Sequence, residues 1–337
     1  MQLNPLVTKL ASPLQIGSAT APNRVFLAPM SGVSDVPFRT IASGYGAGLV
    51  ISEMVASELL ARGDGEANLR AERAGAGLHV VQLAGREARW MEAGARVATD
   101  AGADIIDINM GCPAKKVTGG YSGSALMRDL DHALKLIEAT VAATALPVTL
   151  KMRLGWDDRS INAPELAARA EAAGVRLITV HGRTRCQFYS GDADWAAIRA
   201  VKDEISIPLI ANGDLISPAD LGRMLTLSGA DGVMIGRGAY GRPWLPGHMA
   251  AFAATGAMPA IPSGEELLGI IRGHYEGILA HYGDAVGVRV ARKHLGWYLA
   301  KRILPPSLRQ TLMTSTNAAH VLSFLDAALV DEERRAA

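Results

Sequence analysis

The sequence predicts a (β/α)8 TIM barrel followed by a small all-helical domain. Eight short apolar segments rich in Val, Ile and Leu recur, and each is followed by a loop and by an Ala-rich pattern typical of a helix. Such near-continuous apolar strands indicate a parallel sheet that is buried on both faces. The ends of the segments lie 24 to 42 residues apart, the length of one strand–helix unit. A doubly wound sheet is the alternative that this pattern leaves open.

The expected strands follow one another along the first two thirds of the chain. They occupy residues 24–29, 48–54, 78–85, 104–111, 147–155, 176–184, 207–214 and 230–238. The strand pattern stops after Arg242, and helical patterns then cover residues 264–283, 286–303 and 315–329. Pro259 and Pro262 indicate a linker, and Pro305-Pro306 is expected to end the second helix because proline cannot continue one. We therefore expect a barrel domain over residues 1–250 and a helical domain over residues 251–337.

Composition excludes several classes of protein. The chain has 337 residues, 49% of them hydrophobic and 20% charged, and its mean hydropathy of +0.15 is typical of a protein with a substantial core. No segment approaches the roughly 18 apolar residues of a membrane span. Two cysteines, Cys112 and Cys186, are too few for a disulfide framework. No metal-ligand spacing of His, Cys and carboxylates occurs. We expect a cytoplasmic monomer without a metal site.

Polar side chains stand at the carboxyl ends of most expected strands. Active sites of barrels of this class lie at that end. The residues there are Met30, Glu53, Gln82, Asn109, Lys151, His181, Asn212 and Gly236. As a ring they could bind a flat heterocycle or an anion, although each one alone could be an ordinary polar residue of a barrel mouth.

Two glycine-containing turns follow the last two strands. The glycines of residues 236–241 have G-x-G-x-x-G spacing, but no second strand–helix–strand half follows them, so a dinucleotide fold is not indicated. In a barrel, the loops after strands seven and eight form the usual phosphate site. Residues 212–214 and 236–238 therefore predict a phosphate site, with Arg237 adding positive charge. Simple turn glycines are the alternative interpretation.

Lys151 and His181 are candidate ligand contacts. Lys151 lies on an apolar strand with no acidic neighbour in sequence, and an isolated buried ammonium group is costly unless an anion faces it. A ligand phosphate or the electron-rich edge of a reduced flavin would serve, while a Schiff-base lysine is the rival interpretation. His181 ends the sixth strand, where either a structural role or a ligand contact is possible.

Cys112 lies on the loop after the fourth strand, in the stretch DINMGCPAKKVTGGYSG (107–123). A free cysteine is usually a small buried apolar residue. Here Gly111 and Pro113 fix the turn around it and two lysines follow. A thiol with a pKa of about 8.5 is mostly protonated at neutral pH, so Cys112 could be a general acid, or a nucleophile if its pKa is depressed.

The chain resembles the tRNA-dihydrouridine synthases, most closely the bacterial DusB-like branch. The motifs that carry this resemblance are LAPMSGVSDVPFR (27–39), VQLAG (81–85), DINMGCPAKKVTGGYSGSALM (107–127), LKMRLGWDD (150–158), ITVHGRTRCQFYSGDADW (178–195), IANGD (210–214) and DGVMIGRGAYGRPW (231–244). The resemblance runs from about residue 23 to residue 242 and continues more loosely into the helical region.

The resemblance implies FMN at the barrel mouth, reduced by NADPH, and a flipped tRNA uridine as the substrate. The residues that it assigns to FMN are Pro29, Met30, Ser31, Gln82, Lys151, His181, Asn212, Gly213, Asp214, Gly236 and Arg237. It makes Cys112 the proton donor to C5 of the uracil ring, opposite a hydride delivered to C6. Asn109 and Arg183 are similar in position to family residues that contact the uracil.

A local basic segment is the expected tRNA contact. The formal net charge is only +1, yet residues 286–310 contain no Asp or Glu. Their basic residues are Arg289, Arg292, Lys293, Lys301, Arg302 and Arg309. Arg292 and Lys293 are the expected phosphate contacts, and a solvated helix face is the alternative. Two other functions stay open: an FMN oxidoreductase of a free pyrimidine, as in dihydroorotate dehydrogenases, and a non-catalytic RNA-binding regulator.

Overall fold

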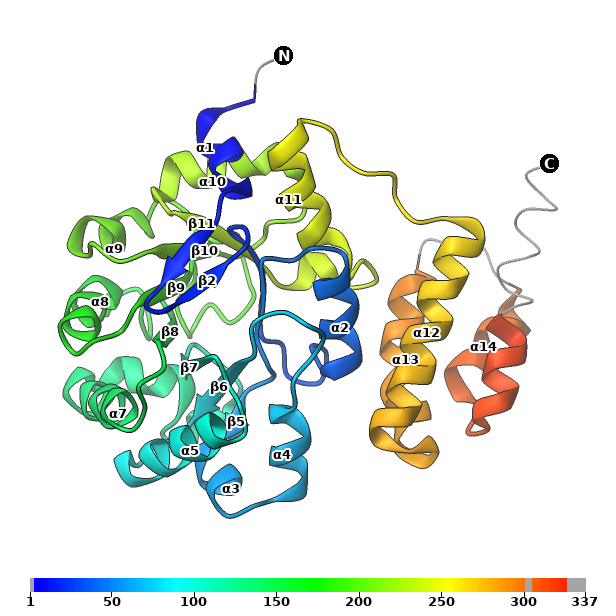
Figure 1. Ribbon diagram of the computed structural model, residues 1–337, viewed down its shortest axis with the longest axis horizontal. Helices are drawn as coiled ribbons and strands as arrows, with labels where there is room; N and C mark the ends of the chain where they lie inside the picture. Colours follow the sequence, from blue (N-terminus) through cyan, green and yellow to red (C-terminus); the bar gives the residue numbers. More distant parts are fainter. Residues whose placement is uncertain (1–2, 301–304, 326–337) are drawn as a thin grey trace.

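The structure is a computed structural model that describes residues 3–300 and 305–325, and its centre is a curled parallel sheet (Figure 1). The strands of this sheet are β3 (Val25–Leu27), β4 (Leu49–Val50), β5 (Val55–Ala56), β6 (Val80–Ala84), β7 (Ile105–Met110), β8 (Val148–Arg153), β9 (Leu177–His181), β10 (Leu209–Asn212) and β11 (Gly232–Ile235). Their order is β4-β3-β11-β10-β9-β8-β7-β6-β5, and every pairing is parallel. The expected TIM barrel is confirmed.

The second expected strand, 48–54, is interrupted. Its two pieces, β4 and β5, pair with β3 and β6 respectively, and a parallel bridge from Ile51 to Val80 closes the ring between them. Within the interruption, the Ser52 hydroxyl accepts a hydrogen bond from the backbone N–H of Gln82 at 2.9 Å. The carboxylate of Glu53 accepts one from the backbone N–H of Gly32. The interruption therefore links the loop after β3 to the rim of the barrel.

The interior of the barrel has an apolar lower layer and a polar upper layer. Side chains of a strand alternate between its two faces. The lower layer includes Phe26, Leu49, Ile105, Leu177, Ile210 and Met234, which form one buried cluster. This cluster also contains side chains of an antiparallel hairpin, β1 (Leu14–Ile16) and β2 (Ala19–Ala21), that the sequence analysis did not predict. Its three-residue strands are too short to give a periodic signal.

Helices surround the sheet, and their apolar faces pack on the outward side chains of the strands. They are α1 (Pro5–Thr8), α2 (Val36–Gly44), α3 (Ser57–Ala61), α4 (Gly65–Ala71), α5 (Ala88–Asp100), α6 (Lys115–Thr118), α7 (Leu130–Ala142), α8 (Ala163–Ala172), α9 (Arg199–Glu204), α10 (Leu221–Ser228) and α11 (Leu245–Thr255). Among the residues that the structure describes, no helix is both long and apolar enough to cross a membrane.

The C-terminal region is helical and lies beside α2 (Figure 1). It contains α12 (Gly264–Tyr282), α13 (Asp284–Tyr298) and α14 (Pro306–Thr314), and residues 318–325 are again helical. The expected second helix is shorter than predicted. Pro305 and Pro306 begin α14 instead, because proline fits the first turn of a helix, where its missing N–H is not needed. The boundary expected at residue 250 falls inside α11, and the division into two functional domains stays a prediction.

Candidate active site

A cavity of about 600 Å³ opens at the carboxyl ends of the barrel strands. Thirteen of the residues selected from the sequence line it: Pro29, Met30, Ser31, Gln82, Asn109, Cys112, Lys151, His181, Asn212, Gly213, Asp214, Gly236 and Arg237. The parallel register explains this convergence, since Asn109 pairs with Lys151 on the next strand, and His181 pairs with Asn212. Loops after several strands complete the wall, with Phe188, Tyr189 and Tyr240 at its rim.

Lys151 is a buried ammonium group, and few groups of the protein offset the cost of burying its charge. Lys151 is 9% exposed, and its Nζ donates a hydrogen bond to Oδ1 of Asn212 at 3.2 Å. Burial lowers the pKa of Lys151 to about 8, and the charge of Arg153 lowers it further, while Asp107 opposes the shift. An anionic or electron-rich ligand edge in the cavity would supply the missing partner.

A chain of buried side chains leads from Asp107 to the loop of Cys112. The Asp107 carboxylate accepts hydrogen bonds from the Thr149 hydroxyl at 2.5 Å and from Nε2 of Gln82 at 2.6 Å. Gln82 in turn accepts one from Nδ2 of Asn109 at 2.8 Å. Oδ1 of Asn109 accepts the backbone N–H of Cys112 at 3.0 Å. The chain fixes the amide orientations of Gln82 and Asn109.

Asp107 is a site residue that the sequence analysis did not select. Burial raises its pKa, and the two hydrogen bonds to its carboxylate act in the opposite direction. A signal was available in the sequence, since Asp107 and Asn109 are two residues apart on one strand and so face the same side. An acidic residue inside an apolar strand indicates a buried polar network.

Cys112 is partly buried in the wall of the cavity, and its sulfur is not in a disulfide. Its carbonyl accepts hydrogen bonds from the backbone N–H of Ser124 at 3.1 Å and from the Ser124 hydroxyl at 2.9 Å. Burial raises the pKa of the thiol above its usual value, although a backbone N–H of Ala114 and the charge of Arg153 oppose this. The thiol is therefore protonated at neutral pH, as a general acid must be.

Arg153 is a second residue that the sequence analysis missed. It is buried at the end of β8, and it donates hydrogen bonds to three backbone carbonyls: Gly111 at 2.9 Å, Thr184 at 2.8 Å and Phe188 at 2.8 Å. It thereby joins the loop of Cys112 to the loop after β9. Its guanidinium also lies 5.4 Å from the centre of the Tyr189 ring.

The predicted phosphate end of the cavity has tight backbone geometry. Gly213 has a φ of 122°, and a Cβ at this position would lie 2.5 Å from the Cβ of Ala193. Burial holds the pKa of His181 well below its usual value, so the imidazole is neutral at physiological pH. Arg237 reaches Asp214 at 3.0 Å with its side chain 44% exposed. Only glycine fits at residue 213, and the positive charge of Arg237 beside this turn favours an anion.

Arg183 does not line the cavity. It is 1% exposed, and it donates to Asp214 at 2.5 Å and to the carbonyls of Ser190 at 3.2 Å and Gly191 at 2.5 Å. The structure places its guanidinium behind the cavity wall, where it fixes Asp214 and the loop after β9. Its expected contact with a uracil stays a prediction, and these partners favour a positioning role.

The side chains of Arg292 and Lys293 contact other parts of the protein. Nη2 of Arg292 donates to the carbonyls of Thr314 at 3.1 Å and Ser315 at 3.3 Å, at the end of α14. Nζ of Lys293 faces Gly32, 3.6 Å from where a Cβ at this glycine would lie. The contact of both residues with tRNA stays a prediction. Two other members of the basic segment, Arg289 and Arg309, are exposed, and Lys301 and Arg302 lie outside the described residues.

A family model and two named relatives place the chain in the same protein family. A family model described as "Dihydrouridine synthase (Dus)" matches residues 26–333. The chain is 58% identical over 317 residues to a protein of Rhizobium leguminosarum bv. phaseoli named "Probable tRNA-dihydrouridine synthase", covering 92% of this chain and 97% of that one. It is 45% identical to "tRNA-dihydrouridine synthase B" of Pseudomonas putida, covering 86% and 87% of the two chains.

Solved structures support the fold. Morphinone reductase superimposes with a TM-score of 0.52 at 19% sequence identity, covering 77% of this chain and 92% of its own. At this identity the likeness concerns the barrel architecture. Within residues 3–300 and 305–325, no group of three or more His, Cys, Asp or Glu side chains is arranged as metal ligands.

Proposed function

Because the chain belongs to the dihydrouridine synthase family, we propose that it reduces specific uridines in tRNA to 5,6-dihydrouridine, with FMN as cofactor and NADPH as the reductant. The observation that carries this proposal is the position of Cys112, a protonated thiol in the wall of a cavity that also contains Lys151 and the glycine turns. The overall reaction is balanced: uridine, NADPH and one proton give dihydrouridine and NADP⁺.

The cavity fits FMN on two observations. Lys151 is a buried cation with a single side-chain partner, Asn212, and the N1–C2=O edge of a flavin would be a suitable second partner. At the other end, the turn at Gly213 excludes any Cβ, and Arg237 adds positive charge, as a phosphate requires. Pro29, Met30 and Ser31 would contact the ring system, and Gln82 would bond its polar edge. His181, Asn212, Asp214 and Gly236 would contact the ribityl chain and the phosphate.

The protein's own contribution to the chemistry centres on the thiol. When bound, FMN supplies the redox chemistry, taking reducing equivalents from NADPH and delivering a hydride to C6 of the uracil ring. Hydride addition at C6 leaves negative charge on C5 and O4. Cys112 then transfers its proton from Sγ to C5, and the resulting thiolate takes up a proton from solvent. Arg153 and Lys151 lower the cost of that transient thiolate by their charge.

Asn109 has one hydrogen-bonding group left for a substrate. Both lone-pair positions of its Oδ1 accept backbone N–H groups, from Gly111 at 3.2 Å and Cys112 at 3.0 Å. One hydrogen of its Nδ2 is donated to Gln82. The remaining N–H can donate to a uracil carbonyl. We therefore expect Asn109 to recognise the base by donating this hydrogen bond, while its Oδ1 holds the Cys112 loop in position.

The proposed test is an anaerobic half-reaction experiment. The enzyme is reduced with NADPH, and unmodified tRNA or free uridine is then added while the flavin absorbance is followed. We expect tRNA, and not free uridine, to reoxidise the wild-type enzyme. In Cys112→Ala, reduction by NADPH should be unchanged, whereas reoxidation by tRNA should slow by roughly 10²–10⁴-fold, the usual contribution of a general acid. Cys186→Ala, at an exposed free cysteine, is the matched control.

Other outcomes assign the protein to other functions. Reoxidation by free uridine would favour an oxidoreductase of small pyrimidines. Bound flavin that neither substrate oxidises would favour a non-catalytic RNA-binding protein. Wild-type rates in Cys112→Ala would remove the thiol from the mechanism.

We further propose a cytoplasmic, monomeric enzyme. The two cysteines are free, as expected for a reducing compartment. The described residues of one chain line the cavity, so the proposed site does not require a second subunit. Size-exclusion chromatography with light scattering tests the oligomeric state.

A further inference from the structure

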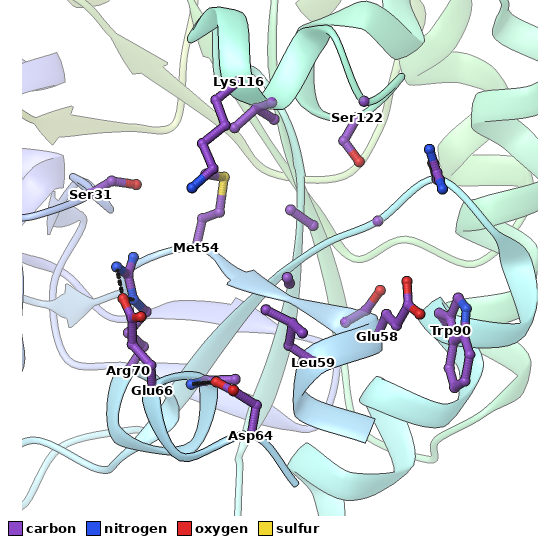
Figure 2. Close-up of a pocket in the computed structure, with 18 residues that line it drawn as sticks. Ser31, Met54, Glu58, Leu59, Asp64, Glu66, Arg70, Trp90, Lys116 and Ser122 are labelled. Atoms are coloured by element: carbon purple, nitrogen blue, oxygen red, sulfur yellow. Dashed lines mark hydrogen bonds and ion pairs between the residues drawn. The ribbon is translucent and has the colours of Figure 1, made fainter. Parts of the chain in front are cut away.

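A second cavity, of about 520 Å³, adjoins the first one (Figure 2). The two cavities share Ser31 and Met54 in their walls. The second lies between α3 and α4 on one side and the loop that carries Cys112 on the other, and this loop contributes Lys116, Val117, Gly120 and Ser122. Met54 and Lys116 both line the second cavity, and their side chains are labelled in Figure 2. A ligand that occupies both cavities would pass beside Met54.

The carboxylates of this second cavity are mostly engaged by the protein. Glu66 accepts from Nη2 of Arg70 at 2.5 Å, and Glu58 accepts from Arg62 at 2.9 Å. Asp64 caps α4 by accepting the backbone N–H of Ala67 at 2.9 Å. These contacts leave the acidic groups oriented and able to accept further hydrogen bonds from hydroxyl or amino groups.

Two cations of the same wall are less engaged. Lys116 is exposed, and its ammonium group forms no hydrogen bond or ion pair with any of the residues that the structure describes. Arg86 is 58% exposed, and its nearest carboxylate is that of its neighbour Glu87, at 3.7 Å. Leu59 also lines the cavity, and this apolar side chain belongs to a residue that is 47% exposed. The cavity thus offers charge for a phosphate, acceptors for hydroxyl groups and an apolar wall for a base.

We propose that this second cavity binds the adenosine diphosphate half of the reduced nicotinamide dinucleotide. The inference rests on the proposed function, which requires a reductant to reach the first cavity. Only the nicotinamide end of that molecule has to enter the first cavity, and its other half needs an adjoining site. Lys116 and Arg86 bind the phosphates, Leu59 packs on the adenine, and Asp64 or Glu66 accepts from the ribose hydroxyls.

The charges favour a dinucleotide over an RNA strand in this cavity. Glu66 and Glu58 stand at its edge with side chains 72% and 41% exposed. A continuous phosphate backbone would pass these carboxylates and be repelled by them, whereas a dinucleotide has its phosphates only at its centre or on one ribose. An acidic side chain that accepts from a ribose hydroxyl is a known element of dinucleotide recognition.

The test compares two double variants of the flavin-loaded enzyme. Arg86→Ala/Lys116→Ala removes the two proposed phosphate contacts. Lys115→Ala/Arg96→Ala removes one lysine of the same short helix and one exposed arginine of α5, neither of which lines either cavity. Binding of ADP-ribose is measured by calorimetry, and the Kd for NADPH is measured from stopped-flow flavin reduction. Reduced nicotinamide mononucleotide, which lacks the adenosine half, is the reference reductant.

We expect the Kd of Arg86→Ala/Lys116→Ala for ADP-ribose and for NADPH to rise at least about tenfold, which is about 1.4 kcal/mol. The Kd for the mononucleotide should equal that of wild type, and the control variant should behave as wild type with all three ligands. Equal ADP-ribose binding by variant and wild type would overturn the inference. So would a variant that keeps its NADPH affinity and loses tRNA affinity, since the cavity would then bind RNA.

The same experiment separates this inference from the proposed function. Reoxidation of the reduced wild-type enzyme by tRNA tests the proposed function alone. ADP-ribose binding that depends on Arg86 and Lys116 supports the second site whatever the oxidising substrate is, and wild-type enzyme that binds no ADP-ribose overturns it.

Discussion

Lys151 gives a pH dependence that can be measured at the scale of one residue. Its pKa in the protein is about 8, lowered from the usual 10.5 chiefly by burial. The charged form therefore predominates below pH 8 and is lost as the pH rises through that value. Because FMN presents an electron-rich edge and a phosphate, we expect the flavin-free protein to bind FMN more weakly above pH 8, by at most tenfold per pH unit for a single proton.

Lys151→Met tests this assignment because it keeps the apolar stem and removes the charge. Its Kd for FMN should be higher than that of wild type at pH 7 and should approach the wild-type value as the pH rises above 8. Fluorescence titration between pH 6.5 and 9.5 provides the measurement, with Lys135→Met on α7 as a control that leaves the cavity intact. Parallel pH profiles for wild type and Lys151→Met would contradict the assignment.

At the scale of elements, one turn joins the helical region to the barrel mouth. Tyr240 lines the first cavity, and its ring stacks on Trp297 of α13 with 4.0 Å between the ring centres and an angle of 12°. Next to it, Gly241 has a φ of 65°, and a Cβ there would lie 2.6 Å from the carbonyl oxygen of Trp297. The turn after β11 therefore lies directly against the end of α13, so this helix sets the position of the cavity rim.

Gly241→Ala should disturb this contact. The left-handed backbone costs a non-glycine residue about 1 kcal/mol, and the collision with a backbone carbonyl adds to that cost. We expect the midpoint of thermal unfolding to fall by several degrees and tRNA-dependent reoxidation to slow more than reduction by NADPH. Gly102→Ala is the matched control, since its φ of 85° imposes a similar backbone cost with no atom within 4 Å of the new Cβ. Equal effects of the two substitutions would show that the α13 contact is unimportant.

At the scale of the whole molecule, the basic segment divides into exposed and internal residues. Arg289 and Arg309 are exposed on α13 and α14, whereas Arg292 contacts the end of α14 and Lys293 faces Gly32. Asp35 caps α2 beside this lysine, and burial raises the pKa of its carboxyl to about 6. Lys293 thus joins the helical region to the loop that lines both cavities.

Salt dependence of tRNA binding separates the two pairs. Replacing Arg289 and Arg309 by Ser should weaken binding and reduce the slope of log K against log salt by about one to two units, because each phosphate contact contributes roughly one. Replacing Arg292 by Gln and Lys293 by Met should mainly lower the free energy of unfolding, by about 1 kcal/mol for the lost partly buried charges. Electrophoretic mobility shift at several salt concentrations and thermal unfolding measure the two effects. If the slope of log K against log salt is also reduced in the second variant, then Arg292 or Lys293 contacts tRNA directly.

The sequence by itself determined the barrel fold and most of the residues that line the mouth of the barrel. Apolar strands at regular spacing have few ways to bury both faces, and the residues that end parallel strands meet at one edge whatever the side chains are. For this reason thirteen selected residues, from Pro29 to Arg237, line one cavity. The hairpin at residues 14–21 and the helix that begins at Pro306 escaped prediction, because short elements lack periodicity and proline both ends and begins helices.

Only the tertiary structure decided which polar side chains face a ligand and which face the protein. Arg183 and Arg237 are equally basic in the sequence, but one is enclosed by Asp214 and two carbonyls while the other lines the cavity. Asp107 and Arg153 were recognised as residues of the site only from hydrogen bonds to partners that are distant in the chain. The second cavity likewise combines α3, α4 and the loop of Cys112. The physical reason is that hydrogen bonds and burial depend on distances across the fold, which local sequence patterns do not encode.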